Sequence, residues 1–402
     1  MQEIIIKTYI AKYFYTNEVN NLMPTIPYLK QKIGQAYLIW YQLSNQYILL
    51  EEPAWFVFRK IVKRFKTETI ALEFESRYDI AYNDSLLFVK DIRSGIKKIG
   101  RKDNNPNDLD KITADLKMHL FSPFSTHHYK IGNQVIAFYF ENFIFEQYLH
   151  PLISHFETDE TNCEMTVFEL FSWEGQIVFR FDGKVKGIWT KDETHLVKGL
   201  IFMFLINVMH HKTDADWLMT VHASAITNGK KTILFSAPPN HGKTTIAALL
   251  QSRGYQLISD DFVPIDRDSF CAFPFPIAMS VKQNSMDLLA SVFPGLEEKK
   301  LTYISPGKSV RYLSPHPFDV SKAIFPVREF VFVEYNHSVD FNLEKLDPIK
   351  AIKLLLDQAW VSPEKGNAAI LFERIQQVSF FKLTYSNNNK ALDAIINLFD
   401  ND

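Results

Sequence analysis

The sequence of 402 residues has little cysteine and almost no net charge, and these two shortages already exclude some classes of protein. Its two cysteines, Cys163 and Cys271, stand far apart, so they cannot by themselves form a disulfide framework or a zinc site. Such cysteine usage is typical of a reducing compartment, and we expect a cytoplasmic protein. The formal net charge of −2 gives no electrostatic reason to expect binding to nucleic acid.

The sequence also lacks a hydrophobic run long enough to cross a membrane. The most apolar stretch, residues 199–209, falls well short of the ~20 residues that a spanning helix needs, and we expect a buried helix there. Residues 1–14 mix charged with apolar side chains and lack the pattern of a signal peptide. We therefore expect neither a membrane nor nucleic acid among the partners.

Motifs of two large hydrolase classes are missing as well. The sequence has no Ser-centred nucleophile elbow and no His-Glu-x-x-His metalloprotease helix. Two pairs of adjacent histidines remain, His127 with His128 and His210 with His211. Neighbouring side chains on a strand or helix point apart, so neither pair predicts a metal site.

The composition that is present is globular, with 47% hydrophobic and 22% charged residues, and the length allows two or three domains. The pattern breaks at residues 101–112, where Asn, Asp and Lys replace any apolar period, and we interpret this stretch as a linker. It separates an N-terminal module, residues 1–100, from a larger domain, residues 113–402.

The N-terminal module has the pattern of strands followed by helices. A strand pair is expected within residues 37–50. Helices are expected to begin near Pro53, near Thr67 and at Asn83 or Asp84, each followed by apolar residues at helical spacing. Two strands and three helices would make a small winged-helix-like module.

The larger domain is expected to combine three parts. Residues 125–190 contain strand-like segments and the turn pairs Glu-Gly and Asp-Gly, which predicts antiparallel β structure. Residues 196–313 alternate strand and helix signals, which is typical of α/β folds. Residues 325–402 add a further α/β part without recognisable chemistry. The expected fold class is α/β with a mixed β-sheet, α+β over the whole chain.

The stretch with the most specific chemistry is Ala-Pro-Pro-Asn-His-Gly-Lys-Thr-Thr, residues 237–245, between a strand-like and a helix-like segment. A phosphate-binding loop needs backbone N–H groups, a helix N-terminus, a lysine and a hydroxyl. Lys243 would meet the phosphates of ATP, and the Thr244 hydroxyl would bind Mg²⁺. The other residues expected to bind the nucleotide are Ala237, Asn240, His241, Gly242 and Thr245.

This stretch departs from the usual pattern G-x-x-x-x-G-K-[ST]. Ala237 replaces the first glycine, and Pro238 and Pro239 each remove a backbone donor. Asn240 stands where glycine is frequent, and asparagine tolerates left-handed φ better than most residues. A Gly-Lys-Thr that merely begins a helix is the alternative interpretation.

A pair of aspartates, Asp260 and Asp261, favours the functional interpretation. They follow the apolar segment 255–258, and in a parallel α/β unit the carboxyl ends of strands share one crevice with the phosphate loop. One carboxylate could hold Mg²⁺ while the other takes a proton from an attacking hydroxyl. The alternative is a strand-end turn or a helix cap, both common for aspartate.

These pieces, in this order, resemble the HPr kinase/phosphorylase-like family within the phosphoenolpyruvate carboxykinase-type P-loop fold. The matching segments are residues 221–226 (VHASAI), 237–245 (APPNHGKTT), 253–261 (RGYQLISDD) and, more weakly, 273–285 (FPFPIAMSVKQNS). The resemblance covers residues 196–313, the expected nucleotide-binding core. The glycine-containing Glu-Ile-Arg-type signature of true HPr kinases is not found downstream, which argues against HPr as the substrate.

The resemblance implies roles for individual residues. Asp260 would be the general base toward a Ser or Thr hydroxyl, and Asp261 a Mg²⁺ ligand. His222 would orient or tune these carboxylates, the alternative being a buried strand histidine with a satisfied ring. Lys282 and Arg311 would contact the transferred phosphoryl group or the substrate, unless they are solvated surface cations.

The N-terminal module resembles PqqD-like peptide-recognition domains. The residues that carry this resemblance are 47–61 (YILLEEPAWFVFRKI), 67–79 (TETIALEFESRYD) and 84–92 (DSLLFVKDI). Such domains bind a leader peptide by adding it to a sheet edge, whose unpaired donors and acceptors give affinity. The alternative is a helical cap that packs on the larger domain.

Together these features predict an ATP- and Mg²⁺-dependent kinase that phosphorylates a Ser or Thr hydroxyl of a peptide. Its substrate would be a ribosomally synthesised precursor peptide (RiPP) that the N-terminal module recruits. A nucleotide-binding adaptor without phosphotransfer and a small-molecule kinase are the alternatives. HPr kinase-like proteins often oligomerise, which leaves a homo-oligomer open.

Overall fold

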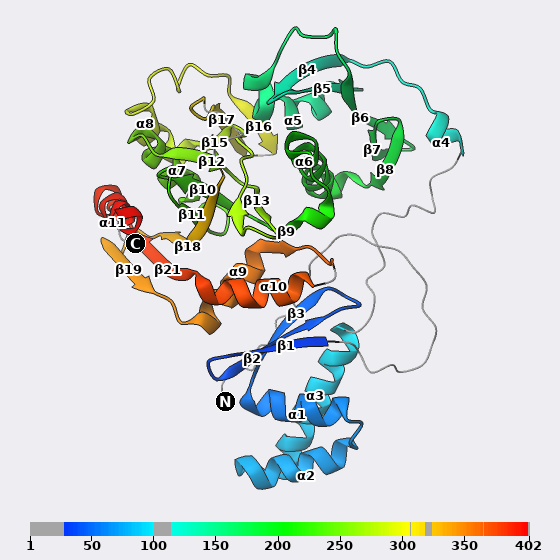
Figure 1. The fold of residues 1–402 in the computed structure, drawn as a ribbon, viewed down its shortest axis with the longest axis vertical. Helices are drawn as coiled ribbons and strands as arrows, with labels where there is room; N and C mark the ends of the chain where they lie inside the picture. The colour runs from blue at the N-terminus through cyan, green and yellow to red at the C-terminus, as the bar shows by residue number, and fades with distance from the viewer. Residues whose placement is uncertain (1–27, 100–113, 306, 318–323, 365, 401–402) are drawn as a thin grey trace. The chain divides into compact units, whose positions relative to one another are not determined.

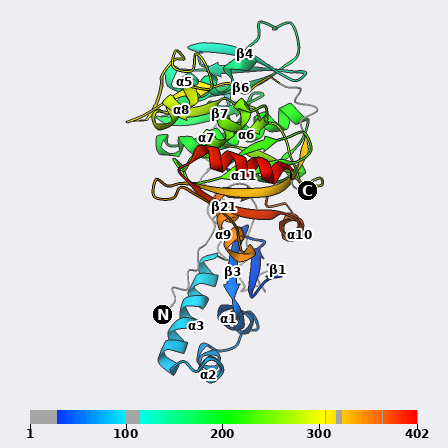
Figure 2. The ribbon, with the colours of Figure 1, turned by 90° about the vertical axis from the view of Figure 1, so that its left-hand side faces the viewer.

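The computed structural model describes residues 28–99, 114–305, 307–317, 324–364 and 366–400. The expected linker and the N-terminal stretch without a signal-peptide pattern lie outside these ranges. The chain forms two compact units. Figure 1 labels their elements, and Figure 2 shows the same ribbon turned by 90°. One unit consists of Met1–Asn105 with Leu346–Phe380, and the other of Pro106–Lys345 with Phe381–Asp402.

The first unit is built on a three-stranded antiparallel sheet of order β1-β2-β3. Its strands are β1 (Tyr28–Ile33), β2 (Ala36–Tyr41) and β3 (Gln46–Glu51). The other elements of this unit are α1 (Glu52–Val62), α2 (Thr67–Tyr78), α3 (Tyr82–Ile99), α9 (Pro348–Gln358), the short strand β20 (Ala359–Val361) and α10 (Asn367–Arg374). The expected strand pair and three helices are present, and β1 is an additional strand.

Helices cover both faces of this sheet. Strand β2 is buried almost throughout, including the neighbours Leu38 and Ile39, which requires cover on each side. On one face Ile39 belongs to a core shared with α1, α2 and α3. On the other face Tyr47 packs against Phe372 of α10, with ring centroids 6.3 Å apart. Residues 346–380, expected from the sequence in the larger domain, thus complete the core of the N-terminal unit.

The second unit contains a five-stranded sheet of order β4-β5-β6-β7-β8. After the short helix α4 (Ala114–Met118), its strands are β4 (Ser125–Ile131), β5 (Gln134–Phe140), β6 (Met165–Trp173), β7 (Gln176–Phe181) and β8 (Lys184–Trp189). The expectation of purely antiparallel pairing is wrong for β5 and β6. They run parallel because helix α5 (Phe143–Ile153) connects them and returns the chain to the end of the sheet at which β5 begins.

Two hairpin turns of this sheet follow their sequence pattern. Glu174 and Gly175, between β6 and β7, both have positive φ, and so do Asp182 and Gly183 between β7 and β8. Two-residue turns with positive φ match the twist of antiparallel strands, which is why Asp-Gly and similar pairs predict hairpins.

A second, mixed sheet has the order β12-β10-β11-β18-β14-β13-β9, and β21 pairs with both β18 and β19. Strands β11 and β18 are parallel, whereas β10 is antiparallel to its neighbours. The strands are β9 (Trp217–Val221), β10 (Ala223–Thr227), β11 (Thr232–Ser236), β12 (Gln256–Ser259), β13 (Val263–Asp266), β14 (Cys271–Ala272), β18 (Phe325–Tyr335), β19 (Phe341–Lys345) and β21 (Ser379–Tyr385).

Two helices and a third sheet surround the core of this part. Helices α7 (Lys243–Ser252) and α11 (Asn388–Asp400) contribute Ile246 and Ile395 to one cluster of buried side chains. Met279 joins the same cluster from a small antiparallel sheet of order β15-β17-β16. Its elements are β15 (Met279–Lys282), α8 (Met286–Ala290), β16 (Thr302–Ser305) and β17 (Lys308–Leu313).

Helix α6 (Thr194–His210) directs apolar side chains to more than one side. Phe204 contacts Phe179 of β7 on one side, and Phe202 contacts Phe262, next to β12, on another. A helix of this kind is buried, as the sequence predicts. Among the helices that the structure describes, none is long and apolar enough to cross a membrane. Helices and mixed sheets together make the described part of the chain α+β, as expected.

Candidate functional site

The loop between β11 and α7 contains two residues with left-handed backbone, one of them directly before the helix. Asn240 and Gly242 both adopt left-handed φ, 71° and 92°, which asparagine and glycine tolerate best. Gly242 directly precedes α7. A Cβ atom added to Gly242 would stand 2.7 Å from the hydroxyl of Tyr385, so only glycine fits at this position. Ala237, in place of the usual first glycine, is buried at the end of β11.

Four of the expected residues meet at the N-terminal end of α7. Lys243 is buried, and its Nζ lies 3.2 Å from Oδ1 of Asp261. The hydroxyl of Thr244 donates to Oδ2 of Asp260 over 3.2 Å. The start of α7 and the two residues after β12 therefore belong to one site.

The register of the mixed sheet explains this convergence. Strands β11 and β12 flank β10, and both run antiparallel to it. Ala223 pairs with Ser236, and Ala225 pairs with Ser259, so the carboxyl ends of β11 and β12 and the beginning of β10 lie at one sheet edge. His222, directly before β10, is thereby brought to the loop and the aspartates.

His222 links Lys243 to Asp261. Its Nδ1 donates to the backbone carbonyl of Asp261 over 3.1 Å, which leaves Nε2 to accept from Nζ of Lys243 at 3.2 Å. Burial, and after it the charge of Lys243, lowers the pKa of His222, in agreement with a neutral ring. The imidazole therefore holds the lysine and the aspartate in one geometry.

Asp260 and Asp261 are adjacent but differ in electrostatic surroundings. Asp260 is almost fully buried and accepts hydrogen bonds from Ser224 and Thr244, and burial raises its pKa. Asp261 keeps 46% of its side chain exposed. Desolvation by the surrounding protein acts to raise the pKa of Asp261. Nearby positive charge, foremost that of Lys243, outweighs it and holds this pKa below its usual range. One carboxyl group is thus disposed to take up a proton while the other stays ionised.

The backbone of Asp261 is strained. Its φ of 74° lies in the left-handed region, which costs a residue with a side chain on the order of 1 kcal/mol. Such a conformation persists only where the surroundings hold it, and the Asp261 carbonyl accepts a hydrogen bond from Nδ1 of His222. Strained residues cluster at functional sites, which supports a functional interpretation of this turn.

The two cations expected beside the substrate lie in different places. Lys282 of β15 donates to Oδ1 of Asn240 over 2.7 Å, so the structure brings it to the loop. Arg311 of β17 donates to the backbone carbonyl of Lys299 instead. It pairs with Val281, the neighbour of Lys282, and consecutive strand residues point to opposite faces. Arg311 and Lys282 therefore lie on opposite faces of this sheet, and the structure does not bring Arg311 to the loop.

The remaining two loop residues have partners close by. Nδ1 of His241 donates to the backbone carbonyl of Pro239 over 3.0 Å. The hydroxyls of Thr245 and Ser285 lie 2.9 Å apart, which joins the first turn of α7 to the segment after β15. Both residues thus help to fix the shape of the loop.

Ser224 belongs to the site, although it was not predicted from the sequence. Its hydroxyl donates to Oδ1 of the buried Asp260, whose Oδ2 accepts from the hydroxyl of Thr244. A signal was present: Ser224 follows His222, an expected site residue, by two positions near the start of β10.

Side chains from three further elements lie within electrostatic range of Asp261: Lys198 of α6, Tyr148 of α5 and Tyr312 of β17. Burial lowers the pKa of Lys198, against the opposing effect of Asp261. Burial, with a contribution from Asp261, raises the pKa of each tyrosine to about 12. A single lysine within an apolar helix is a recognisable signal, because a buried cation needs a partner. The two tyrosines carry no such signal.

Comparisons with known proteins do not identify the chemistry of this site. No family model matches the chain, and no curated protein matches it in sequence. Among solved structures, the chain is similar to the Hpr(Ser) kinase/phosphatase from Coxiella burnetii, with 12% identity and a TM-score of 0.19, over 45% of this chain and 87% of that one. A likeness of this degree is too slight to assign an activity.

Proposed function

We propose that this protein is an ATP- and Mg²⁺-dependent kinase that transfers a phosphoryl group to a Ser or Thr hydroxyl of a peptide. The observation that supports this most is the meeting of Lys243, Thr244, Asp260 and Asp261 at the N-terminus of α7, behind a turn with left-handed backbone. A lysine, a hydroxyl and two carboxylates in one place are the groups on which phosphoryl transfer depends.

The positive groups of the site suit the phosphates of ATP. The N-terminus of α7 favours an anion, although Pro238 and Pro239 contribute no N–H donors to the turn. Lys243 adds a buried charge, and Lys282 adds a second one at Asn240. Two lysines and a helix terminus would stabilise the negative charge of a transferring phosphoryl group.

The carboxylates would divide two tasks. Bound Mg·ATP supplies the phosphoryl group and a dication that prefers oxygen ligands. The ionised Asp261 and the Thr244 hydroxyl are the proposed ligands, and Asp260, with its raised pKa, is the proposed general base. The hydrogen bond between Thr244 and Asp260 favours the opposite division, in which Asp260 stands on the Mg²⁺ side. Asparagine variants of the two residues distinguish these assignments.

Phosphate incorporation tests the activity. The full chain is incubated with ATP, Mg²⁺ and peptides that contain Ser or Thr, and the peptide mass is followed. Asp260→Asn should abolish transfer while ATP binding stays measurable. An adaptor, which Ala237 and the two loop prolines motivate, would bind ATP and leave every peptide unmodified.

The N-terminal unit would recruit the peptide. In the part of this unit that the structure describes, β1 ends the sheet, and an edge strand offers unpaired donors and acceptors to an added strand. A peptide with its leader should then have a lower KM than the same peptide without it, at a similar kcat. A small-molecule kinase would show no such difference.

A further inference from the structure

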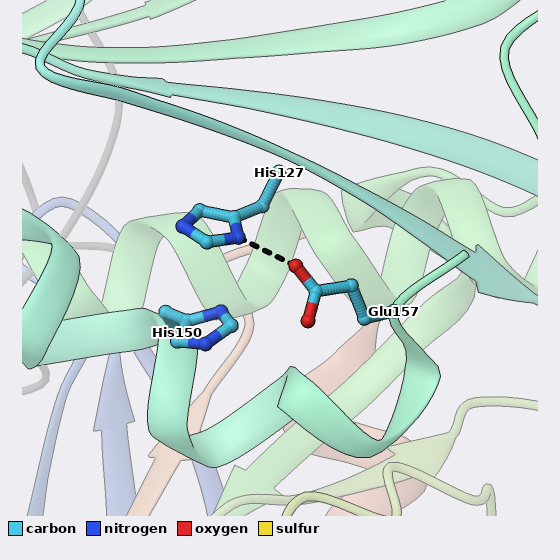
Figure 3. Close-up of side chains that lie close together, drawn as sticks. All are labelled: His127, His150 and Glu157. Atoms are coloured by element: carbon cyan, nitrogen blue, oxygen red, sulfur yellow. Dashed lines mark hydrogen bonds and ion pairs between the residues drawn. The ribbon is translucent and has the colours of Figure 1, made fainter. Parts of the chain in front are cut away.

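Three side chains with metal-ligating groups lie together outside the proposed nucleotide site (Figure 3). His127 comes from β4, His150 from α5 and Glu157 from the segment that follows α5. One ligand atom from each lies within 4.8 Å of the other two. The histidine pair in the sequence did not predict this cluster, because the partners of His127 come from another element rather than from its neighbour His128.

The second nitrogen of each ring is held by a neighbour. Nδ1 of His127 faces Glu157 at 2.6 Å, and Nε2 lies 2.6 Å from the carboxylate of Glu146. Nδ1 of His150 lies 2.8 Å from the hydroxyl of Tyr129, which leaves Nε2 for a different partner. Histidines that bind metals are typically oriented through the nitrogen that does not bind the ion, often by a carboxylate. Both rings have such an orienting contact.

We propose that His127, His150 and Glu157 bind a divalent transition metal ion of the zinc class. Two imidazoles and a carboxylate are a ligand set that Zn²⁺ accepts, with a fourth position left to water or another group. Glu146 and Glu157, both in contact with His127, supply negative charge that a dication favours. Hard cations such as Mg²⁺ prefer all-oxygen sites and bind such a set weakly.

Binding requires an adjustment of side-chain torsions. The rings of His127 and His150 are stacked, with centroids 4.1 Å apart and planes tilted by 25°. Both lone pairs must point at one ion, about 2.1 Å from each nitrogen. A rotation of the two rings would bring this about, and Glu157, with 48% of its side chain exposed, has room to follow.

A bound ion would join β4, α5 and the segment after α5. Helix α5 also carries Tyr148 into range of Asp261, so the ion would fix a helix that borders the proposed nucleotide site. Its role is therefore structural, and its expected effect is on stability.

Zinc binding to the full chain tests this site, measured by competition with a chromophoric chelator and by the thermal midpoint with and without Zn²⁺. Every protein carries Cys163→Ser, because the exposed thiol is itself a zinc ligand. We expect one Zn²⁺ per chain and a higher midpoint. His150→Ala and Glu157→Gln should weaken binding by roughly 100-fold or more, and Glu146→Gln by about 10–100-fold through loss of the His127 orientation.

Two controls locate the ion. His128→Ala changes the neighbouring histidine on β4, and Asp261→Asn changes the nucleotide site, so both should bind Zn²⁺ like the parent protein. Thermal unfolding without zinc verifies that each variant is folded. The proposal is overturned if the parent binds no Zn²⁺, if His150→Ala and Glu157→Gln bind it equally well, or if Asp261→Asn loses it. The readout is zinc rather than phosphoryl transfer, so failure here is distinct from failure of the proposed kinase activity.

Discussion

Nζ of Lys243 lies 3.2 Å from Oδ1 of Asp261, and this ion pair joins the phosphate side of the site to its acidic side. The lysine is buried and the aspartate is half exposed. A buried charge without a partner is costly, and the Asp261 carboxylate offsets part of the cost of burying Lys243. The charge of Lys243 in turn favours the ionised form of Asp261. Removal of Lys243 therefore takes away the group that would meet phosphate and also the strongest cationic partner of Asp261.

Replacement of Gly242 by alanine should distort the loop. The added Cβ would meet the Tyr385 hydroxyl at 2.7 Å, and the φ of 92° would cost about 1–2 kcal/mol more. Gly229→Ala is the matched control, since Gly229 has φ of 87° and no atom within 4 Å of the added Cβ. We expect Gly242→Ala to lower the free energy of unfolding more than the control does and to weaken ATP binding, which the control retains.

Urea unfolding and ATP titration of both glycine variants check this prediction. Tyr385→Phe in the Gly242→Ala background should recover part of the lost stability, because it removes the atom that the Cβ meets. Equal stability and equal ATP affinity of the two glycine variants would show that the close approach to Tyr385 does not shape the loop.

The division of tasks between the aspartates predicts different responses to Mg²⁺. Asp261→Asn should raise the Mg²⁺ concentration for half-maximal activity roughly 10–100-fold, the effect of losing one charged contact. Asp260→Asn should abolish transfer at every Mg²⁺ concentration. Asp287→Asn, at an exposed position of α8, is the control. The reverse outcome would place Asp260 on the Mg²⁺ side, as its hydrogen bond from Thr244 favours.

His210 should make the protein less stable in mild acid. Its Nε2 donates to the backbone carbonyl of Pro274 over 2.7 Å, and burial lowers the pKa of His210 to about 4. The unfolded chain, with a histidine pKa near 6.5, then binds more protons between pH 6.5 and 4, so the free energy of unfolding falls as the pH falls through this window. The loss should reach about 3 kcal/mol, at ~1.4 kcal/mol per pKa unit.

Urea unfolding at several pH values measures this loss. His210→Gln keeps an N–H donor for Pro274 and does not titrate, so its stability should change less between pH 7 and pH 4 than that of the wild type. Identical pH profiles for the two proteins would exclude His210 as the source.

The elements of the proposed nucleotide site were predictable because their signals are local. A buried strand, a turn with Asn240 and Gly242, and a helix that begins at Lys243 are each written in a few adjacent residues. Their proximity to Asp260 was expected because the carboxyl ends of strands in an α/β unit share one crevice with such a loop. The role of β10, which lies between β11 and β12 and brings His222 and Ser224 to the same edge, depends on strand order, which adjacent residues do not specify.

The features that escaped prediction depend on packing between distant segments. Tyr148 and Lys198 lie within electrostatic range of Asp261, on α5 and α6, which precede the loop by many residues. Residues 346–380 complete the N-terminal unit because β2 is apolar on both faces and needs a second cover. The parallel pairing of β5 with β6 follows from the intervening helix α5. This helix was not predicted from the sequence, because residues 125–190 were interpreted as strands.

Titration of the full chain with ATP, with and without Mg²⁺, tests the proposed site most directly. It is carried out calorimetrically on the wild type, on Lys243→Ala and on Lys230→Ala, an exposed lysine in the turn between β10 and β11. We expect one ATP per chain, tighter binding with Mg²⁺, an affinity about 10–100-fold lower in Lys243→Ala, and wild-type affinity in Lys230→Ala. A folded wild-type protein that binds no ATP, or a Lys243→Ala variant that binds it equally well, would contradict the proposed site.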